Sequence, residues 1–300
     1  MSGSNRIQIG QKRADAALSK ASALDEVIAE INALVGMNDI KVQLAELVAL
    51  GRVIAVRRDR DIPLQKISLH LVFTGPPGTG KTVVARKIGK LFRAIGLLNK
   101  GHCIEVDRSK LVGRFVGEAG QLVQEAVKDA LDGVLFIDEA YLLAGGTGPL
   151  SSSDQYGTEA IGTLLSLMEN YRDRLVVIVA GYNSPMRRFL DNNVGLKSRF
   201  TRQFDFKSYS HDELIEIFWL LVKVAHYQFD DGARREVEKY IRTMDRSRED
   251  FGNARDVRNF LERIVPVQAL RLGELENLES LSNDELMTIT AEDVRTITQV

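Results

Sequence analysis

The chain has 300 residues, which is enough for one large domain or two modest domains that each bury a core. Hydrophobic residues make up 44% and charged residues 27%, and this composition excludes a chain that is disordered throughout. Lysine and arginine number 40 against 41 acidic residues, so the net charge of -1 implies no overall attraction to nucleic acid or to an anionic membrane.

The single cysteine and the N-terminal residues indicate a cytoplasmic protein. Cys103 has no partner cysteine, which excludes an internal disulfide and favours a reducing compartment. No apolar run approaches the roughly 18 residues of a membrane-spanning helix, so we expect no membrane insertion. Residues 1–23 are expected to form a flexible tail without the apolar core of a signal peptide.

The predicted elements describe an α/β domain over residues 24–206. Two helices come first, at Leu24–Leu34 and Ile40–Val56, where apolar residues recur every three or four positions. Short apolar strands then alternate with crossover helices, as in a mostly parallel sheet. The strands are Leu69–Thr74, Cys103–Val106, Val134–Asp138 and Leu175–Gly181, and the helices are Thr82–Ile95, Glu118–Leu131 and Thr158–Tyr171.

Residues 207–300 are predicted to form a small α-helical domain, because strand-like runs cease after Tyr209. Several of its helices are preceded by Ser, Asp or Asn, which are residues that cap helix N-termini. The predicted helices are His211–His226, Asp231–Asp245, Asn253–Leu272 and Ala291–Ile297.

A phosphate-binding loop, the Walker A motif, is predicted between the first strand and the next helix. Its residues are Gly75, Pro76, Pro77, Gly78, Thr79, Gly80, Lys81 and Thr82. The glycines let backbone N–H groups face a phosphate, Lys81 supplies a cation to the β- and γ-phosphates of ATP, and the Thr82 hydroxyl can bind Mg²⁺. The alternative is a glycine-rich turn that happens to contain a lysine, and the flanking strand and helix argue against it.

Two acids end the third predicted strand, as in a Walker B motif. Asp138 and Glu139 come at the sheet edge where the phosphate loop also emerges. Asp138 is therefore the candidate Mg²⁺ ligand, and Glu139 the candidate base that polarises the water attacking the γ-phosphate. Without a phosphate loop, both acids could equally be solvated residues at a strand end.

An asparagine follows the fourth predicted strand. If that strand lies beside the first, Asn183 comes near the γ-phosphate and can orient the attacking water. Asparagine after a strand is otherwise a common turn residue, so this assignment depends on the other two motifs.

Together these motifs resemble the AAA+ superfamily and, within it, the CbxX/CfxQ family, which includes red-type Rubisco activases, sporulation-associated proteins and the ATPase domain of type VII secretion chaperones. The likeness extends from about Leu24 to the end of the chain. The resemblance implies a parallel five-stranded sheet followed by a helical lid, ATP hydrolysis and a hexameric ring. The matching segments are Leu71–Thr82, Gly133–Tyr141, Val177–Tyr182 and Gly195–Phe200.

The resemblance also implies roles for three arginines. Ser198–Arg202 is similar to the arginine-finger segment, through which one subunit reaches the γ-phosphate of its neighbour; Arg199 is the first candidate and Arg202 the second. Such a finger stabilises the transition state and contributes on the order of a thousandfold in related NTPases. Gly252–Arg255 resembles the sensor-2 motif, so Arg255 is expected to approach the γ-phosphate of its own subunit and to couple the lid to the nucleotide.

Gly113–Gly117 resembles the pore loop of AAA+ threading proteins. In a ring, Phe115, Val116 and Gly117 would line the channel and grip a polypeptide through apolar contact. The alternative places Phe115 in the hydrophobic core.

The sequence therefore predicts an ATPase that uses ATP and Mg²⁺ to remodel a protein client from a homo-hexameric ring. A red-type Rubisco activase is one specific form of this function, and an ATP-gated assembly platform or a secretion chaperone without threading is the alternative. We expect no tetratricopeptide domain, because too few residues precede Leu24 to form one. Nucleic acid is a disfavoured partner, since the charge is near neutral and the pore loop is aromatic.

Overall fold

The computed structural model describes residues 22–63, 67–113, 115, 117–144, 155–248, 250–276 and 278–298. The chain forms two compact units: the first combines the chain up to Gly75 with Lys81–Phe206, and the second combines Pro76–Gly80 with the chain from Lys207 onward. Most of the predicted flexible tail lies outside the described residues. Its last two positions, 22 and 23, belong instead to a helix over residues 22–32.

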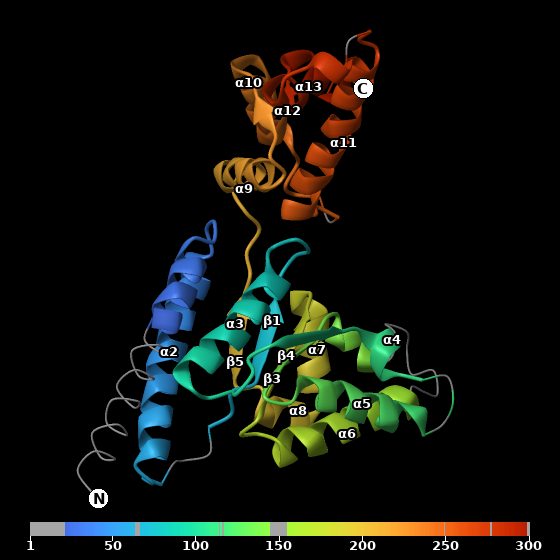
Figure 1. Ribbon diagram of the computed structural model, residues 1–300. Coiled ribbons are helices and arrows are strands. Elements are labelled where there is room, and N and C mark those ends of the chain that lie inside the picture. The colour runs from blue at the N-terminus through green and yellow to red at the C-terminus, as the bar shows by residue number, and fades with distance from the viewer. Residues whose placement is uncertain are drawn as a thin grey trace, which may run out of the picture. The chain divides into compact units, whose positions relative to one another are not determined.

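A five-stranded parallel sheet forms the centre of the first unit (Figure 1). The strand order is β2-β3-β4-β1-β5, and every neighbouring pair is parallel, so the carboxyl ends of all strands meet at one edge. This sheet confirms the predicted fold class. The strands are β1 (Leu71–Thr74), β2 (Cys103–Val106), β3 (Gly133–Ile137), β4 (Leu175–Gly181) and β5 (Arg202–Asp205).

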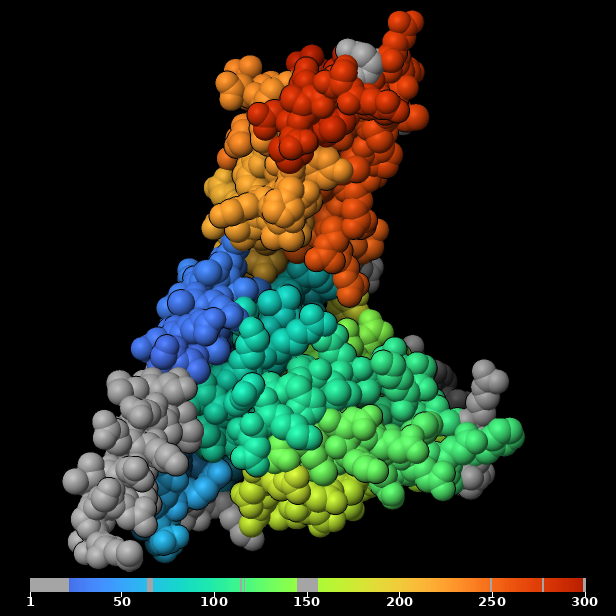
Figure 2. Space-filling model, viewed as in Figure 1, coloured from blue at the N-terminus to red at the C-terminus, as the bar shows by residue number. Residues whose placement is uncertain are grey.

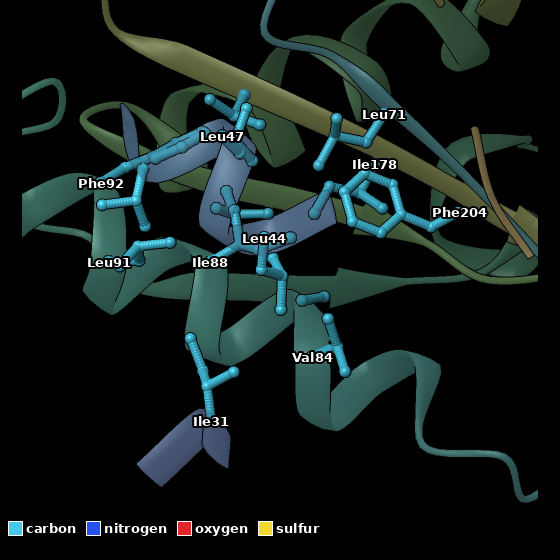
Figure 3. Packing of buried hydrophobic residues seen from close by; sticks show 14 of the residues in the cluster. Ile31, Leu44, Leu47, Leu71, Val84, Ile88, Leu91, Phe92, Ile178 and Phe204 are labelled. Carbon is cyan, nitrogen blue, oxygen red and sulfur yellow. The ribbon is translucent and has the colours of Figure 1, made fainter. Parts of the chain in front are cut away.

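Helices cover both faces of the sheet, because successive residues of a strand point to opposite faces. On β1, Leu71 and Phe73 pack into one hydrophobic cluster, and Val72 packs into the other. The first cluster includes α2 (Asn38–Asp59) and α3 (Lys81–Ile95), and Figure 3 shows side chains of both helices converging with those of the sheet. The second cluster includes α5 (Glu118–Ala130) and α6 (Gln155–Asn170). The first unit is therefore a three-layer α/β/α structure.

Short elements after the strands complete the first unit. The helix α4 (Arg108–Leu111) follows β2, and the 3₁₀-helix η1 (Ala140–Ala144) follows β3. Two more helices, α7 (Asn183–Asp191) and α8 (Val194–Arg199), lie between β4 and β5. Each of these helices is close to a strand end, where the predicted site residues are found.

The second unit is mainly helical, and Ser210 with Glu213 forms a capping box at the start of its first helix. Its helices are α9 (His211–Val224), α10 (Asp231–Thr243), α11 (Ala254–Gly273), η2 (Leu278–Ser280), α12 (Asn283–Met287) and α13 (Ala291–Thr298). The expectation that strands cease after Tyr209 is wrong, since β6 (Gln228–Phe229) pairs in parallel with β7 (Thr288–Ile289). Two-residue strands are too short to produce an alternating pattern in the sequence. Within the described ranges, no helix is both long and apolar enough to cross a membrane.

His70 is buried just before β1, in a position where its imidazole is neutral. The ring Nδ1 accepts the Val177 N–H at 3.0 Å, which requires a lone pair on that nitrogen. Burial, together with the charge of Arg199, lowers the pKa of His70 from 6.5 to about 4. Between these values the unfolded chain binds a proton that the folded chain does not, so stability falls as the pH drops.

We expect the free energy of unfolding to fall between pH 7.5 and pH 5 by about 2 kcal/mol more in the wild type than in a His70→Asn variant. Asparagine can accept the Val177 N–H but does not titrate, and all other titrating groups cancel in the comparison. Urea unfolding of both proteins at the two pH values measures the difference. An identical pH dependence would contradict a depressed pKa for His70.

Candidate functional site

The glycines of the phosphate loop adopt backbone conformations that other residues rarely take. Gly75, Gly78 and Gly80 have φ values of 142°, 66° and 89°. A Cβ on Gly75 would lie 2.1 Å from the Phe206 carbonyl oxygen, so a side chain does not fit there. The backbone thus curls tightly between β1 and α3, as a loop that presents N–H groups to an anion does.

Lys81 and Thr82 begin α3 at the end of this loop. Lys81 Nζ donates to the Gly75 carbonyl oxygen at 2.9 Å, so the ammonium group reaches back across the loop. No acidic residue lies in the first turn of α3, and the positive end of the helix dipole is therefore not offset by a carboxylate of that turn. The Lys81 ammonium group, the N-terminus of α3 and the curled loop backbone together form a site that suits the phosphates of ATP.

Asp138 and Glu139 follow β3 at the same edge of the sheet. Asp138 is half-buried, and its N–H donates to the Val106 carbonyl oxygen at 2.9 Å. Glu139 has a φ of 47°, which is uncommon for a residue other than glycine, and its N–H donates to Asp138 Oδ1 at 3.0 Å. This turn leaves the Glu139 side chain exposed beside a cavity of about 490 Å³ that Asp107 and Leu142 also line.

The oxygen donors of Thr82 and Asp138 fit Mg²⁺ in chemical type. Mg²⁺ in proteins is held by one or two carboxylates together with phosphate groups, rather than by a cage of side chains. In the part of the chain that the structure describes, no group of three or more His, Cys, Asp or Glu side chains is placed to hold a metal ion. The side chains here therefore suit a Mg²⁺ ion that arrives with a nucleotide.

Asn183 lies at the end of β4, which is the neighbour of β1. Thr74 pairs with Gly181, so the strand order meets the condition on which the Asn183 prediction depended. The structure also brings in an acid that the sequence analysis did not single out. Asp205 Oδ1, at the end of β5, accepts both the Asn183 Nδ2–H and the Thr74 hydroxyl at 3.1 Å.

Arg199 and Arg202 lie at the opposite edge of the sheet. Arg202 pairs with Leu71 at the start of β1, whereas Thr74 at its other end leads into the phosphate loop. At a strand rise of about 3.3 Å per residue, the two ends of β1 are roughly 10 Å apart. Arg199 Nη1 donates to the Gly195 carbonyl oxygen at 3.3 Å, and Nη2 lies 4.0 Å from Glu169. The structure does not bring either arginine to Lys81 of its own chain.

Arg255 is the second residue of α11, in the second unit, which also contains Pro76–Gly80. A Cβ on Gly78 would lie 3.0 Å from the Arg255 backbone nitrogen and 1.9 Å from the Gly252 carbonyl oxygen. The segment that resembles sensor 2 therefore contacts the phosphate loop directly, and the Arg255 side chain is exposed. Two nearby residues that the sequence analysis did not assign to the site, Tyr209 and Asn253, also bind the loop.

Phe115 is 69% exposed, which excludes the alternative that it belongs to the hydrophobic core. Its N–H donates to Glu118 Oε2 at 3.1 Å, and Gly117 caps α5 with a φ of 89°. Figure 2 shows the green segment between α4 and α5 projecting at the right-hand edge of the first unit. Val116, the other predicted pore-loop residue, lies outside the described residues.

Comparisons with known proteins agree with this geometry. The profile of the ATPase family associated with various cellular activities (AAA) matches residues 71–208, and that of an AAA lid domain matches residues 210–300. The solved structure of the FIGL-1 AAA domain in complex with ADP superposes with a TM-score of 0.59 at 20% identity, covering 89% of this chain and 82% of that one. That likeness concerns the fold.

Two curated proteins show the sequence relationship. The ESX-3 secretion system protein EccA3 of Mycobacterium leprae is 40% identical over 290 residues, which cover 92% of this chain but only 45% of EccA3. The plasmid-encoded protein CbxX of Cupriavidus necator is 40% identical over 277 residues, which cover 91% of this chain and 85% of CbxX. The chain therefore belongs to the AAA family of ATPases, in the group that contains the CbxX and CfxQ proteins, and it hydrolyses ATP.

Proposed function

We propose that this ATPase is a protein-remodelling motor, in which a ring of six copies uses ATP hydrolysis to pull or pry on a protein client through Phe115. The main support for this proposal is the exposure of the Phe115 side chain. An aromatic ring that is 69% exposed gains nothing from the hydrophobic core, and a contact with a partner would bury it. Gly113 and Gly117 lie two positions to either side of Phe115, which favours an exposed loop over an element of the core.

The proposed hydrolytic roles follow from the residues at the carboxyl edge of the sheet. Lys81 binds the β- and γ-phosphates, and Thr82 and Asp138 hold Mg²⁺, which neutralises phosphate charge when it is bound. Glu139 accepts a proton from the attacking water. Asn183, whose amide is fixed by Asp205, orients that water.

A ring is proposed because Arg199 lies far from the phosphate loop of its own chain. An arginine at the amino edge of the sheet can complete a nucleotide site only in a neighbouring copy. Arg199 ends α8, and its carbonyl oxygen accepts the Ser68 hydroxyl, so both contacts hold its backbone in place. Arg202 remains the second candidate, and Arg255 is proposed to sense the γ-phosphate from the lid.

The relatives suggest different clients for such a motor. EccA3 is named as a secretion system protein, and the CbxX/CfxQ family that the sequence resembles includes red-type Rubisco activases. An ATP-gated platform without threading is the competing function, and Glu139 argues against it because a scaffold has no need of a general base. We place the proposed site of action in the cytoplasm, on a protein rather than on nucleic acid.

The test of the pore-loop role is a Phe115→Ala variant. Because Phe115 is outside the core, we expect its basal ATPase rate to stay within about twofold of the wild type. Clients are first captured from a lysate of the source cells with Glu139→Gln protein and ATP, and then purified. We expect the client to be lost when Phe115→Ala is added to Glu139→Gln, and its remodelling to stop.

Leu270→Ala is the matched control, since Leu270 is an apolar residue of the lid with 71% exposure. It should keep both the client and its remodelling. If Phe115→Ala remodels the client as the wild type does, the assembly-platform function is favoured and threading is wrong.

A further inference from the structure

Hydrogen-bond donors of the second unit bind three consecutive carbonyl oxygens of the phosphate loop. The donors and the residues that carry these carbonyls all belong to that unit. The contacts are Asn253 Nδ2–H to Pro77 O at 3.1 Å, Ala254 N–H to Gly78 O at 3.3 Å, and Tyr209 O–H to Thr79 O at 3.2 Å. The C=O and N–H of one planar trans peptide point in opposite directions. Anchoring these carbonyls on one side therefore fixes the direction of the next three N–H groups on the other side, where a phosphate binds.

Asn253 is built into this position at a conformational cost. It is 0% exposed, and its φ of 52° and ψ of -122° form a combination that residues other than glycine rarely adopt. Its side chain uses both of its functional ends, since Nδ2 donates to Pro77 while Oδ1 accepts the Tyr209 N–H at 3.0 Å. An aspartate has the acceptor but lacks the donor, so the asparagine amide is specifically required.

Tyr209 supplies the third contact from the segment before α9. The residue is buried, and burial raises the pKa of its hydroxyl, which keeps the proton on the oxygen that donates to Thr79. The same residue offers its backbone N–H to Asn253. Tyr209 and Asn253 thus support each other as well as the loop.

We infer that Asn253 and Tyr209 are positioning residues for nucleotide binding, which hold the backbone of Pro77–Thr79 in the shape that presents its N–H groups to phosphate. Neither side chain contacts the nucleotide in this role. The contacts act on the loop backbone, so they set the affinity for ADP and ATP alike and leave the chemical step unchanged. The inference rests on the proposed use of this loop as the nucleotide site, and it does not depend on the ring or on Phe115.

The first test is Tyr209→Phe in the full chain, which removes one oxygen atom and keeps the buried ring. Loss of one hydrogen bond to the loop should raise the Kd for both fluorescent ADP and fluorescent ATP by about fivefold to tenfold. The kcat at saturating ATP should stay within about twofold of the wild type. Tyr240→Phe is the control, because Tyr240 lies in the same unit, packs on Phe260 and should leave both Kd values unchanged.

Asn253→Asp is the second variant, and it turns an oxygen instead of a donor toward the Pro77 carbonyl. We expect a larger rise in both Kd values, of about tenfold or more. If either variant lowers the Tm without nucleotide but binds ADP with the wild-type Kd, the role is only structural and the inference is overturned. A rise in the ATP Kd alone, with the ADP Kd unchanged, also overturns it.

A Lys81→Ala variant tests the premise of this inference, which is that the phosphate loop binds the nucleotide. If Lys81→Ala weakens ATP binding while Tyr209→Phe and Asn253→Asp do not, the loop is the nucleotide site and only the positioning role is wrong. If Lys81→Ala binds ATP as the wild type does, the nucleotide lies elsewhere and both proposals are overturned. Should Asn253→Asp fail to fold, Tyr209→Phe still decides between these results.

Discussion

A Glu139→Gln variant should bind ATP as tightly as the wild type and hydrolyse it at least about a hundredfold more slowly, which is the contribution expected of a general base. The amide matches the carboxylate in size, but it has no basic oxygen to take a proton from water. Glu139 is suited to this role because a turn with a φ of 47° leaves its side chain exposed just beyond the last strand residue. Steady-state phosphate release measures the rate, and fluorescent ATP measures the affinity.

Glu125→Gln is the matched control, since Glu125 is exposed on α5 and is not part of the proposed site. It should hydrolyse ATP at the wild-type rate. If the Glu139→Gln protein does the same, the base is another group, and Asp138→Asn becomes the next variant to measure. If the Glu139→Gln protein instead loses ATP binding, the carboxylate acts in holding the nucleotide rather than in the chemical step.

An Arg199→Ala variant should keep its affinity for ATP and lose about a thousandfold in kcat, as expected for an arginine finger. The position of Arg199 gives a stronger test than the loss itself. It lies at the amino edge of the sheet, whereas Lys81 lies at the carboxyl edge, so in the proposed ring the two residues would serve different nucleotide sites. Mixing inactive Arg199→Ala with inactive Lys81→Ala protein should therefore restore activity.

In an equimolar mixture, the restored activity should reach about a quarter of the wild-type rate. An active interface needs the intact loop of an Arg199→Ala subunit beside the intact finger of a Lys81→Ala subunit, and random assembly gives this pairing at one interface in four. Arg172→Ala is the control, since Arg172 Nη1 binds Glu169 at 3.1 Å, close to Arg199, but is not proposed as a finger. It should be active without mixing. A mixture that stays inactive, although both variants assemble, would contradict catalysis across the subunit boundary.

The sequence predicted the parts of this fold whose signals are local. Apolar runs such as those of β3 and β4 are buried on both faces, so they stand out as near-continuous hydrophobic segments. The phosphate loop and the acids after β3 were found because their chemistry requires fixed residue types at fixed spacing. The two-residue strands β6 and β7 leave no such signal, and β5 is short, with Phe204 as the one apolar residue among its four, so only the resemblance implied a fifth strand.

The supporting roles of Tyr209 and Asn253 were missed because they depend on the three-dimensional fold, although Asn253 lies in the Gly252–Arg255 segment that resembles sensor 2. Asn253 and the Pro77 carbonyl are 176 positions apart in the chain, and Tyr209 and the Thr79 carbonyl are 130 apart. A backbone carbonyl has no signature in a sequence, so nothing marks its partner. Asp205 had a weak signal, since it lies between Phe204 and Phe206 in an alternating pattern that is typical of a strand.

The phosphate loop is divided between the two units, and this division limits how the chain can be truncated. The polypeptide passes from the first unit to the second at Gly75–Pro76, returns at Gly80–Lys81, and passes again at Phe206–Lys207. A recombinant fragment ending at Phe206 would contain all the Walker residues but none of the donors that bind the carbonyls of Pro77, Gly78 and Thr79. A chimera that exchanges the C-terminal part with a relative would likewise transfer the groups that shape the loop, so nucleotide affinity should follow the origin of that part.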